Sequence, residues 1–294
     1  MDLWFIYAIL SAIVGGLAAF MGKIVSARNY SAESYVFHAS IFALLFYAPL
    51  AYVLEPLALT SVTVSVLGLA FLAGIAAGVK SVWKVMALRY VDTVIFFPIF
   101  KVVSPTLVLL AGLLFFDEVF STFEWLGIVF SMLVPLLLIN RVENGRQNDL
   151  LKGILFILII SVFTLLVAAV LKVGASLEAL ALWSVVFLTF GSLLSSTLLY
   201  LINNRTTDIR TLCIQSYGNS FYLVAFVRGV LGQASVFLLV SAFAAGGTLS
   251  IVYVIDSLYI LIPIVLSIIF YREHWNARKV AAIILSIAAL WFLQ

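Results

Sequence analysis

Two charged residues lie deep inside long apolar runs, where they could bind an ionic ligand. Lys101 lies between Pro98 and Pro105 in the run Val91 to Glu118, and Asp256 lies in a later run of the same kind. An ammonium in hydrocarbon costs at least about 2.5–3.5 kcal/mol, so it requires a partner or a water-filled cavity. A carboxylate buried beside a lysine can take up and release a proton when a ligand separates the pair. We therefore predict that Lys101 and Asp256 bind substrate and that Asp256 can couple binding to a proton.

Further cations lie within the apolar runs. Lys80 and Lys84 are one turn apart on one helix face, and Arg228 lies about two turns into its run. With Lys23, Lys101 and Lys172, six cations face the single deep carboxylate of Asp256. Lysine and arginine bind carboxylates and phosphates directly, so an anionic ligand would supply the missing negative charge. The alternative is that the long side chains reach the membrane interface or bind backbone carbonyls.

The sequence contains no recognisable catalytic or metal-binding set. It has only two histidines, and it lacks HExxH, GxSxG, paired intramembrane aspartates and a phosphate-binding glycine loop. His38 is expected to be packed and hydrogen-bonded, and the single cysteine excludes an internal disulfide. The basic residues are scattered, which is not typical of a nucleic-acid surface. We predict no enzyme, no metal, no cofactor and no nucleic-acid partner.

The elements that carry these residues are transmembrane helices. Of 294 residues, 65% are hydrophobic and only 10% are charged, and the mean hydropathy is +1.24. A helix needs about 20 apolar residues to cross a bilayer, and such runs fill nearly the whole chain. The fold class is therefore all-α polytopic membrane protein, with the lipid bilayer as a partner. Ten spans are predicted, at residues 3–27, 33–54, 62–88, 92–116, 122–140, 151–173, 179–202, 221–245, 248–271 and 277–293.

The chain also resembles itself. At an offset of 155 residues, Glu118 aligns with Glu273 and Lys101 with Asp256, while Lys23 aligns with Lys172 at an offset of 149. The polar segment 141–152 separates a first five-helix repeat, 1–140, from a second, 153–294. An odd number of spans inverts the second repeat, and inverted repeats around a midplane site are a recurring plan of secondary transporters. The two aligned charged residues, Lys101 and Asp256, are expected at the same depth in the membrane. They form either the substrate-binding site or a structural ion pair.

Loop chemistry supports these boundaries and predicts an orientation. Ser121 and Glu124 form a capping box before the fifth span, and Asn276 is the equivalent cap of the tenth. Lysine and arginine collect in the loops opposite the termini, whereas the terminal side is acidic. Because positive loops stay cytoplasmic, we expect both termini to face outward from a plasma (inner) membrane. The basic loop residues are Arg28, Arg89, Arg141, Arg146, Lys152, Arg205, Arg210, Arg272, Arg278 and Lys279.

Prolines and aromatic residues surround the two central charges. Pro98 and Pro105, and Pro263 in the second repeat, are expected to kink their helices and free backbone carbonyls, which suits a gate. Five aromatic residues flank the charges and form either a wall of the site or part of the core. They are Phe96, Phe97, Phe100, Tyr253 and Tyr259.

The end of each repeat resembles a known family. Pro105 is followed thirteen residues later by Glu118, in SPTLVLLAGLLFFDE, and the second repeat ends in PIVLSIIFYREHW, with Glu273. In these blocks and in its span count the chain resembles the ten-span, EamA-like branch of the drug/metabolite transporter superfamily. The resemblance implies a basket of ten helices whose central cavity opens alternately to each side. It also implies movement of small polar metabolites. Lys101 and Asp256 are not part of the family pattern.

These observations predict a secondary transporter of a small polar, anionic metabolite, working by alternating access. Lys101, Asp256, Lys80, Lys84 and Arg228 are the predicted substrate-binding residues. One alternative is a multidrug or organic-cation exporter that uses Asp256, and another is a membrane scaffold that transports nothing. The sequence does not specify the substrate, the coupling ion, the direction of transport or the oligomeric state.

Overall fold

A computed structural model describes residues 2–28, 30–55, 60–87, 93–138, 150–177, 180–204, 218–263, 265–266 and 276–294. In these ranges the chain is helical and contains no strand. The helices are α1 Leu3–Ala27, α2 Ala32–Leu54, α3 Ser61–Ala87, α4 Thr93–Phe115, α5 Thr122–Leu137, α6 Leu150–Leu177, α7 Ala181–Asn204, α9 Asn219–Ala244, α10 Leu249–Ser257, the short 3-10 helix η1 Leu258–Ile260, and α12 Ala277–Phe292.

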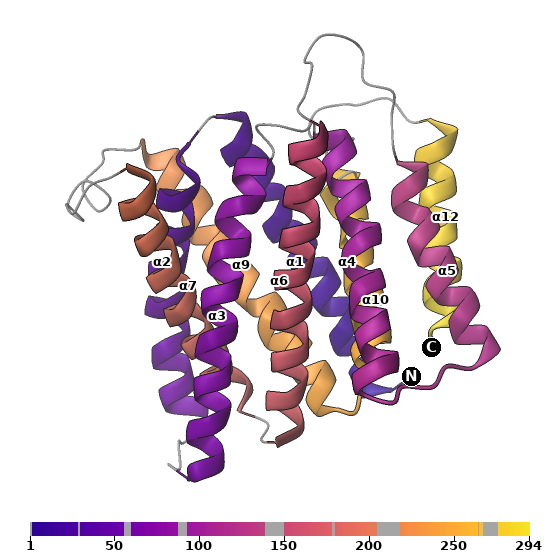
Figure 1. The fold of residues 1–294 in the computed structure, drawn as a ribbon, viewed down its shortest axis with the longest axis horizontal. Helices are drawn as coiled ribbons and strands as arrows, with labels where there is room; N and C mark the ends of the chain where they lie inside the picture. The colour runs from indigo at the N-terminus through magenta and orange to yellow at the C-terminus, as the bar shows by residue number, and fades with distance from the viewer. Residues whose placement is uncertain are drawn as a thin grey trace.

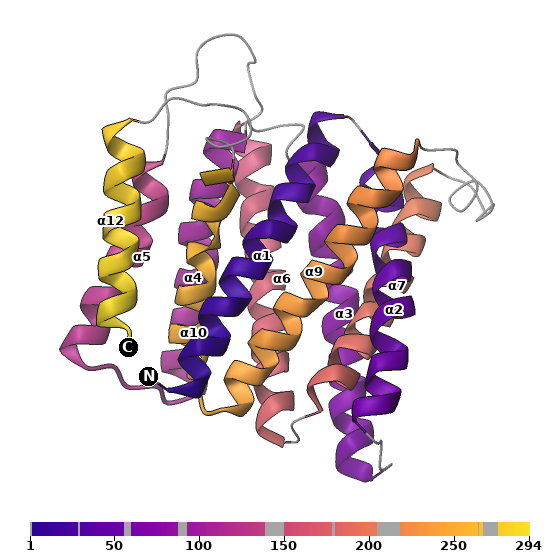
Figure 2. The same cartoon turned by 180° about the vertical axis from the view of Figure 1, so that it is seen from behind.

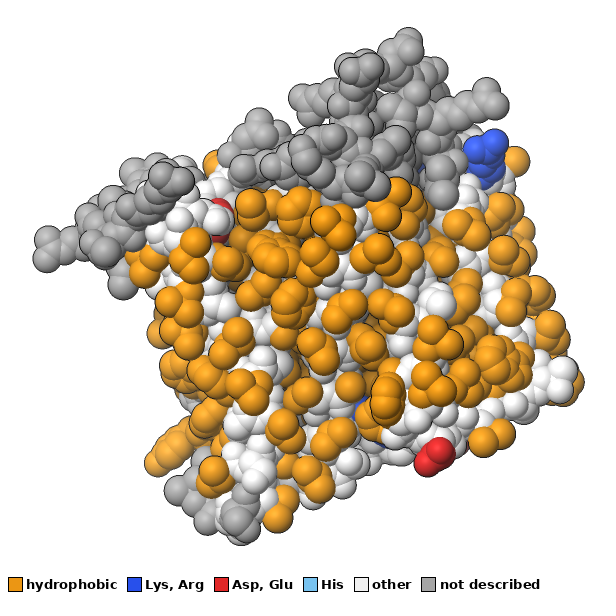
Figure 3. Space-filling view, in the orientation of Figure 1, with side chains coloured by type: hydrophobic (Ala, Val, Ile, Leu, Met, Phe, Trp, Pro, Cys, Tyr) orange, Lys and Arg blue, Asp and Glu red, His pale blue; other side chains and the backbone are white. Residues whose placement is uncertain are grey.

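Seven of the described helices are long and apolar enough to cross a membrane: α1, α2, α3, α4, α6, α7 and α9. Two shorter apolar helices, Thr122–Leu137 and Leu249–Pro263, accompany them. Figure 3 shows hydrophobic side chains over most of one face of the molecule. Many large apolar side chains are exposed there and elsewhere, including Leu114 and Val119. The chain is therefore a polytopic helical membrane protein, because such a surface is stable only against lipid.

The helices stand roughly side by side, with both chain termini at the same end of the molecule (Figures 1 and 2). Helix α1 starts at this terminal end, whereas α6 starts at the opposite end, after the segment that follows α5. Helix α3 packs against α6 and α7, and α9 packs in the same way against α1 and α2. Helix α4 contacts α10, and α5 contacts α12. The predicted basic residues Arg89, Arg141, Arg146, Arg205, Arg210 and Arg272 lie outside the described residues.

Small residues allow the closest helix contacts. A β-carbon at Gly74 of α3 would overlap the backbone carbonyl of Leu188 in α7. A β-carbon at Gly229 of α9 would likewise overlap the carbonyl of Ala39 in α2. Small residues at such positions let two backbones approach closely, which favours association in lipid. Gly74 and Gly229 are 155 residues apart, and their contacts Ala39 and Leu188 are 149 apart, which are the two offsets of the sequence alignment.

Both predicted helix caps are present. The Ser121 side chain accepts a hydrogen bond from the Glu124 amide, and the Glu124 carboxylate accepts one from the Ser121 amide, which completes the capping box of α5. The Asn276 side chain accepts a hydrogen bond from the Lys279 amide at 2.8 Å and so caps α12. The side chain of Glu273, the partner of Glu118 in the alignment, lies outside the described residues.

Two carboxylates at the terminal end cap helices other than their own. Glu118 accepts hydrogen bonds from the amides of Leu249 and Ser250 at the start of α10. Glu55 accepts hydrogen bonds from the amides of Leu182 and Trp183 at the start of α7, each at 3.1 Å. Free amide donors and the helix dipole both favour an anion at these positions.

The prolines lie in different settings in the two halves. Helix α4 continues through both Pro98 and Pro105. In the second half, α10 ends at Ser257, and the 3-10 turn η1 follows at Leu258–Ile260. Pro263 explains the position of this change, because it cannot donate to the carbonyl of Tyr259 and its ring crowds that carbonyl. The change comes one residue beyond Asp256, after Ser257.

Candidate functional site

A cavity of about 250 Å³ lies among the helices and contains most of the predicted binding residues. Its wall is formed by α1, α2, α3, α6, α7, α9, α10 and η1, together with Phe97 of α4. Two apolar clusters of buried side chains border it. One includes Phe5, Leu249 and Val252, and a smaller one includes Val25, Val82 and Phe221. The polar side chains of the wall are Tyr35, Ser40, Lys80, Ser81, Lys84, Ser192, Arg228, Gln233, Ser235, Tyr253, Asp256 and Tyr259.

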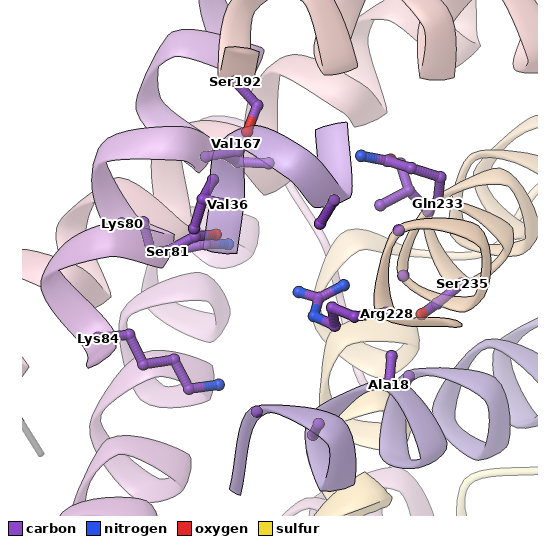
Figure 4. Close-up of a pocket in the computed structure, with 18 of the residues that line it drawn as sticks. Ala18, Val36, Lys80, Ser81, Lys84, Val167, Ser192, Arg228, Gln233 and Ser235 are labelled. Atoms are coloured by element: carbon purple, nitrogen blue, oxygen red, sulfur yellow. The ribbon is translucent and has the colours of Figure 1, made fainter. Parts of the chain in front are cut away.

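Three of the predicted cations line this cavity. Lys80 and Lys84 come from α3, where their spacing of one turn places them on one face, as predicted. Arg228 comes from α9, and Figure 4 shows its guanidinium and the Lys84 amine directed into the same space from opposite sides. A β-carbon at Gly232 would overlap the Arg228 guanidinium. Glycine one turn further along α9 therefore leaves room for this arginine.

Asp256 lies in the last turn of α10 and faces the same cavity. The Ser11 hydroxyl of α1 lies 3.4 Å from its Oδ1 atom. The same hydroxyl donates to the backbone carbonyl of Ser235 in α9 at 2.9 Å, so Asp256 shares it with a nearer acceptor. Lys101, Lys80 and Lys84 all act electrostatically on this carboxylate. Within the described part of the chain, however, no ion pair within 4.0 Å joins Asp256 to a cation.

Lys101, which the sequence alignment pairs with Asp256, acts electrostatically on that carboxylate but forms no ion pair with it in the described structure. It is buried, with 5% of its surface exposed, and it is not part of the cavity wall. Its Nζ atom lies 3.4 Å from the centre of the Tyr259 ring, a cation–π arrangement, instead of against Asp256. Equal offset in the two repeats gave Lys101 and Asp256 comparable positions along α4 and α10, but it did not determine the direction of each side chain around its helix.

The five aromatic residues that flank the charges are divided between cavity and core. Phe97, Tyr253 and Tyr259 line the cavity. Phe96 and Phe100 are buried and stacked, with ring centres 5.8 Å apart, in an apolar cluster that also contains Ile157 and Ile160. Both of the sequence interpretations, wall and core, therefore hold for part of the set.

Two polar groups of the wall were not singled out in the sequence. The Tyr35 hydroxyl and the Gln233 Oε1 atom are buried and have no hydrogen-bond partner in the described structure. Both residues line the cavity. A buried polar group without a partner costs free energy, which a polar ligand would relieve. A tyrosine and a glutamine within apolar runs are a weak sequence signal, because their direction depends on helix rotation.

The remaining predicted groups lie away from the cavity. The Lys172 amine donates to the backbone carbonyl of Gly247 at 2.7 Å, in the turn before α10, as expected for a lysine that binds a carbonyl. Pro98 and Pro105 lie within α4, outside the wall. His38 is packed against Phe221 and Tyr222, and its Nδ1 atom lies 2.8 Å from the Ser34 carbonyl oxygen, as predicted. The Lys23 side chain lies outside the described part of the structure.

Comparisons with known proteins give a fold but no activity. No family model matches the chain, and no curated protein matches it. A solved structure described as "Crystal structure of protein" superposes on 99% of this chain and 95% of its own, with a TM-score of 0.73 and 13% sequence identity. The chain therefore shares its overall fold with an experimentally determined structure.

Proposed function

We propose that the chain is a secondary transporter that moves a small anionic metabolite across the membrane by alternating access. The observation that carries this proposal is the charge of the cavity. Lys80, Lys84 and Arg228 enter it with a single carboxylate, Asp256, and that carboxylate forms no ion pair with them in the described structure. Cations in a partly enclosed cavity of lower dielectric bind a carboxylate or phosphate more strongly than fully exposed cations do.

Two inverted repeats of five helices are part of this proposal. The opposite directions of α1 and α6 support them. The matched contacts Gly74–Leu188 and Gly229–Ala39 also support them, because an approximate two-fold axis that exchanges the repeats carries one contact onto the other. On this plan α5, α10 and α12 complete ten spans, the termini face outward, and the site lies where the repeats meet. The resemblance to drug/metabolite transporters is consistent with the same plan.

Uptake into proteoliposomes tests the proposed function. Labelled inorganic phosphate, small organic phosphates and small carboxylates should enter vesicles that contain the parent protein. Lys84→Gln and Arg228→Gln should each lower uptake at least about tenfold, because each removes a charged hydrogen-bond donor worth about 1.5–3 kcal/mol. Arg278→Gln is the control, since it removes one exposed cation in the first turn of α12, outside the cavity wall, and it should leave uptake near the parent level.

The opposite selectivity would reject the anion proposal. If the vesicles take up organic cations but none of the anions, and Asp256→Asn abolishes that flux, the cavity serves a cation exporter. If the folded protein moves none of these compounds, both transport proposals fail, and the protein is a membrane scaffold without transport activity.

A further inference from the structure

Lys101 is a buried amine that the proposed anion site does not use. It lies in α4 between Pro98 and Pro105, with only 5% of its surface exposed. Its Nζ atom lies 3.4 Å from the centre of the Tyr259 ring and 5.9 Å from the centre of the Phe100 ring. In the described structure no carboxylate lies within 4.0 Å of it. Its immediate surroundings are therefore aromatic.

Tyr259 forms the partition between this amine and the cavity. Its side chain lines the cavity, whereas Lys101 does not. Its hydroxyl lies 3.4 Å from the Nζ atom of Lys84, which is part of the wall. One tyrosine side chain thus contacts two lysines, with its ring against Lys101 and its hydroxyl against Lys84. Removal of the ring would bring a fourth cation to the cavity.

The Tyr259 side chain that covers Lys101 belongs to an irregular part of its helix. Tyr259 lies in the 3-10 turn η1, between the end of α10 at Ser257 and Pro263. Hydrogen bonds in 3-10 turns have poorer geometry than those in α-helices, and Pro263 removes the donor that would bind the Tyr259 carbonyl. A β-carbon at Gly16 of α1 would approach that same carbonyl to 2.9 Å, so α1 and η1 are in close contact. A shift of α1 against η1 would therefore move Tyr259.

We propose that Tyr259 is a positioning residue that screens Lys101 from the cavity in this conformation. A ligand then meets Lys80, Lys84 and Arg228, and it meets Lys101 only when η1 moves the ring aside. The ligand part of this inference rests on the proposed function, whereas the screen itself does not. Tyr259 would thus determine how many cations the ligand contacts in each state of the transport cycle.

Reductive methylation of lysines, read by mass spectrometry, tests the screen in the full-length protein. In the parent, Lys101 should react at least about tenfold more slowly than Lys80 and Lys84, because a covered group reacts only while a local opening exposes it. Tyr259→Ala should remove that difference. Tyr259→Phe should keep it, because the ring remains and only the contact with Lys84 is lost. Equal reaction rates at Lys101 and Lys84 in the parent would overturn the screen, even if no variant folds.

Inorganic phosphate, added as a probe, separates this inference from the proposed function. In the parent, phosphate should slow the methylation of Lys80 and Lys84 and leave Lys101 unchanged. In Tyr259→Ala it should also slow the methylation of Lys101. If phosphate protects no lysine but Lys101 still reacts slowly in the parent, the anion site is contradicted. The screening of Lys101 by Tyr259 is then still supported. Phosphate protection of Lys101 in the parent would contradict the screen.

Discussion

Arg228 owes its position to a residue without a side chain, Gly232. Its guanidinium folds back over Gly232, one turn further along α9, where any side chain would overlap it. Arginine offers five donors in a rigid planar arrangement, so its value for binding an anion depends on where that plane lies. The glycine, which lowers intrinsic helix propensity, is thus a means of directing the charge into the cavity.

Substitution of Gly232 by alanine separates the position of Arg228 from its charge. Gly232→Ala should weaken binding of anions at least about tenfold, because a displaced guanidinium loses charged hydrogen bonds worth about 1.5–3 kcal/mol. Unfolding stability should change little, since alanine favours the helix by about 1 kcal/mol and offsets the shift of the arginine. Titration of the purified variant with inorganic phosphate, followed by thermal unfolding, measures both quantities.

Gly22 provides the matched control for this substitution. It also lines the cavity, but a β-carbon there would have no atom within 4 Å. Gly22→Ala should therefore bind phosphate like the parent. Equal phosphate binding by the parent and both alanine variants would show that the position of Arg228 does not matter.

At the scale of elements, α10 is held at its start by charges from two other segments. Glu118 accepts hydrogen bonds from the Leu249 and Ser250 amides, and Lys172 donates to the Gly247 carbonyl just before them. Gly112 leaves room for the Glu118 carboxylate and the Ser250 hydroxyl. Helix α10 carries Asp256 and leads into Tyr259, so this anchor positions one side of the cavity.

The hydrogen bonds from the start of α10 to Glu118 predict that substitution of this residue lowers stability strongly. Glu118→Ala should lower the free energy of unfolding by about 3 kcal/mol, because buried donors at the start of α10 lose a charged acceptor. Glu118→Gln should cost only about 1 kcal/mol, since it keeps acceptor oxygen and loses the interaction of charge with the helix dipole. Thermal or denaturant unfolding in detergent measures these differences.

Asp117→Asn serves as the control for the anchor. Asp117 is exposed and has a φ of 49°, a conformation that asparagine adopts readily. This variant removes a neighbouring charge at the same end of the molecule and should leave stability nearly unchanged. Equal losses in Glu118→Ala and Asp117→Asn would mean that the overall charge of this end, rather than the cap, is responsible.

Sequence reasoning predicted the local parts of this arrangement well. The caps Ser121 and Asn276 were predictable because a cap is defined by residues within one turn of each other. The shared face of Lys80 and Lys84 was predictable for the same reason. The trans-helix role of Glu118 was not, since its partners are more than a hundred residues away. The lack of a direct ion pair between Lys101 and Asp256 also depends on helix rotation, which a sequence offset does not contain.

At the scale of the whole molecule, the sequence predicted a polytopic helical membrane protein, and the structure confirms this. Ten spans in two inverted repeats remain a proposal. Helices α5 and α12 have 16 residues each, and α10 has nine before its break. At 1.5 Å per residue these are shorter than a hydrocarbon core of about 30 Å. Such helices cross a bilayer only together with neighbouring segments. Helix length alone therefore does not identify them as membrane spans.

A thermal-shift titration measures directly whether the cavity binds anions. Detergent-purified parent protein is unfolded by heat with phosphates, carboxylates and organic cations at matched ionic strength. A ligand that binds only the folded state stabilises it by about 2.7 kcal/mol at one hundred times its dissociation constant. We expect stabilisation by anions, lost in the double variant Lys84→Gln, Arg228→Gln and retained in the surface control Arg278→Gln. Stabilisation by organic cations alone, lost in Asp256→Asn, would contradict anion binding by the cavity.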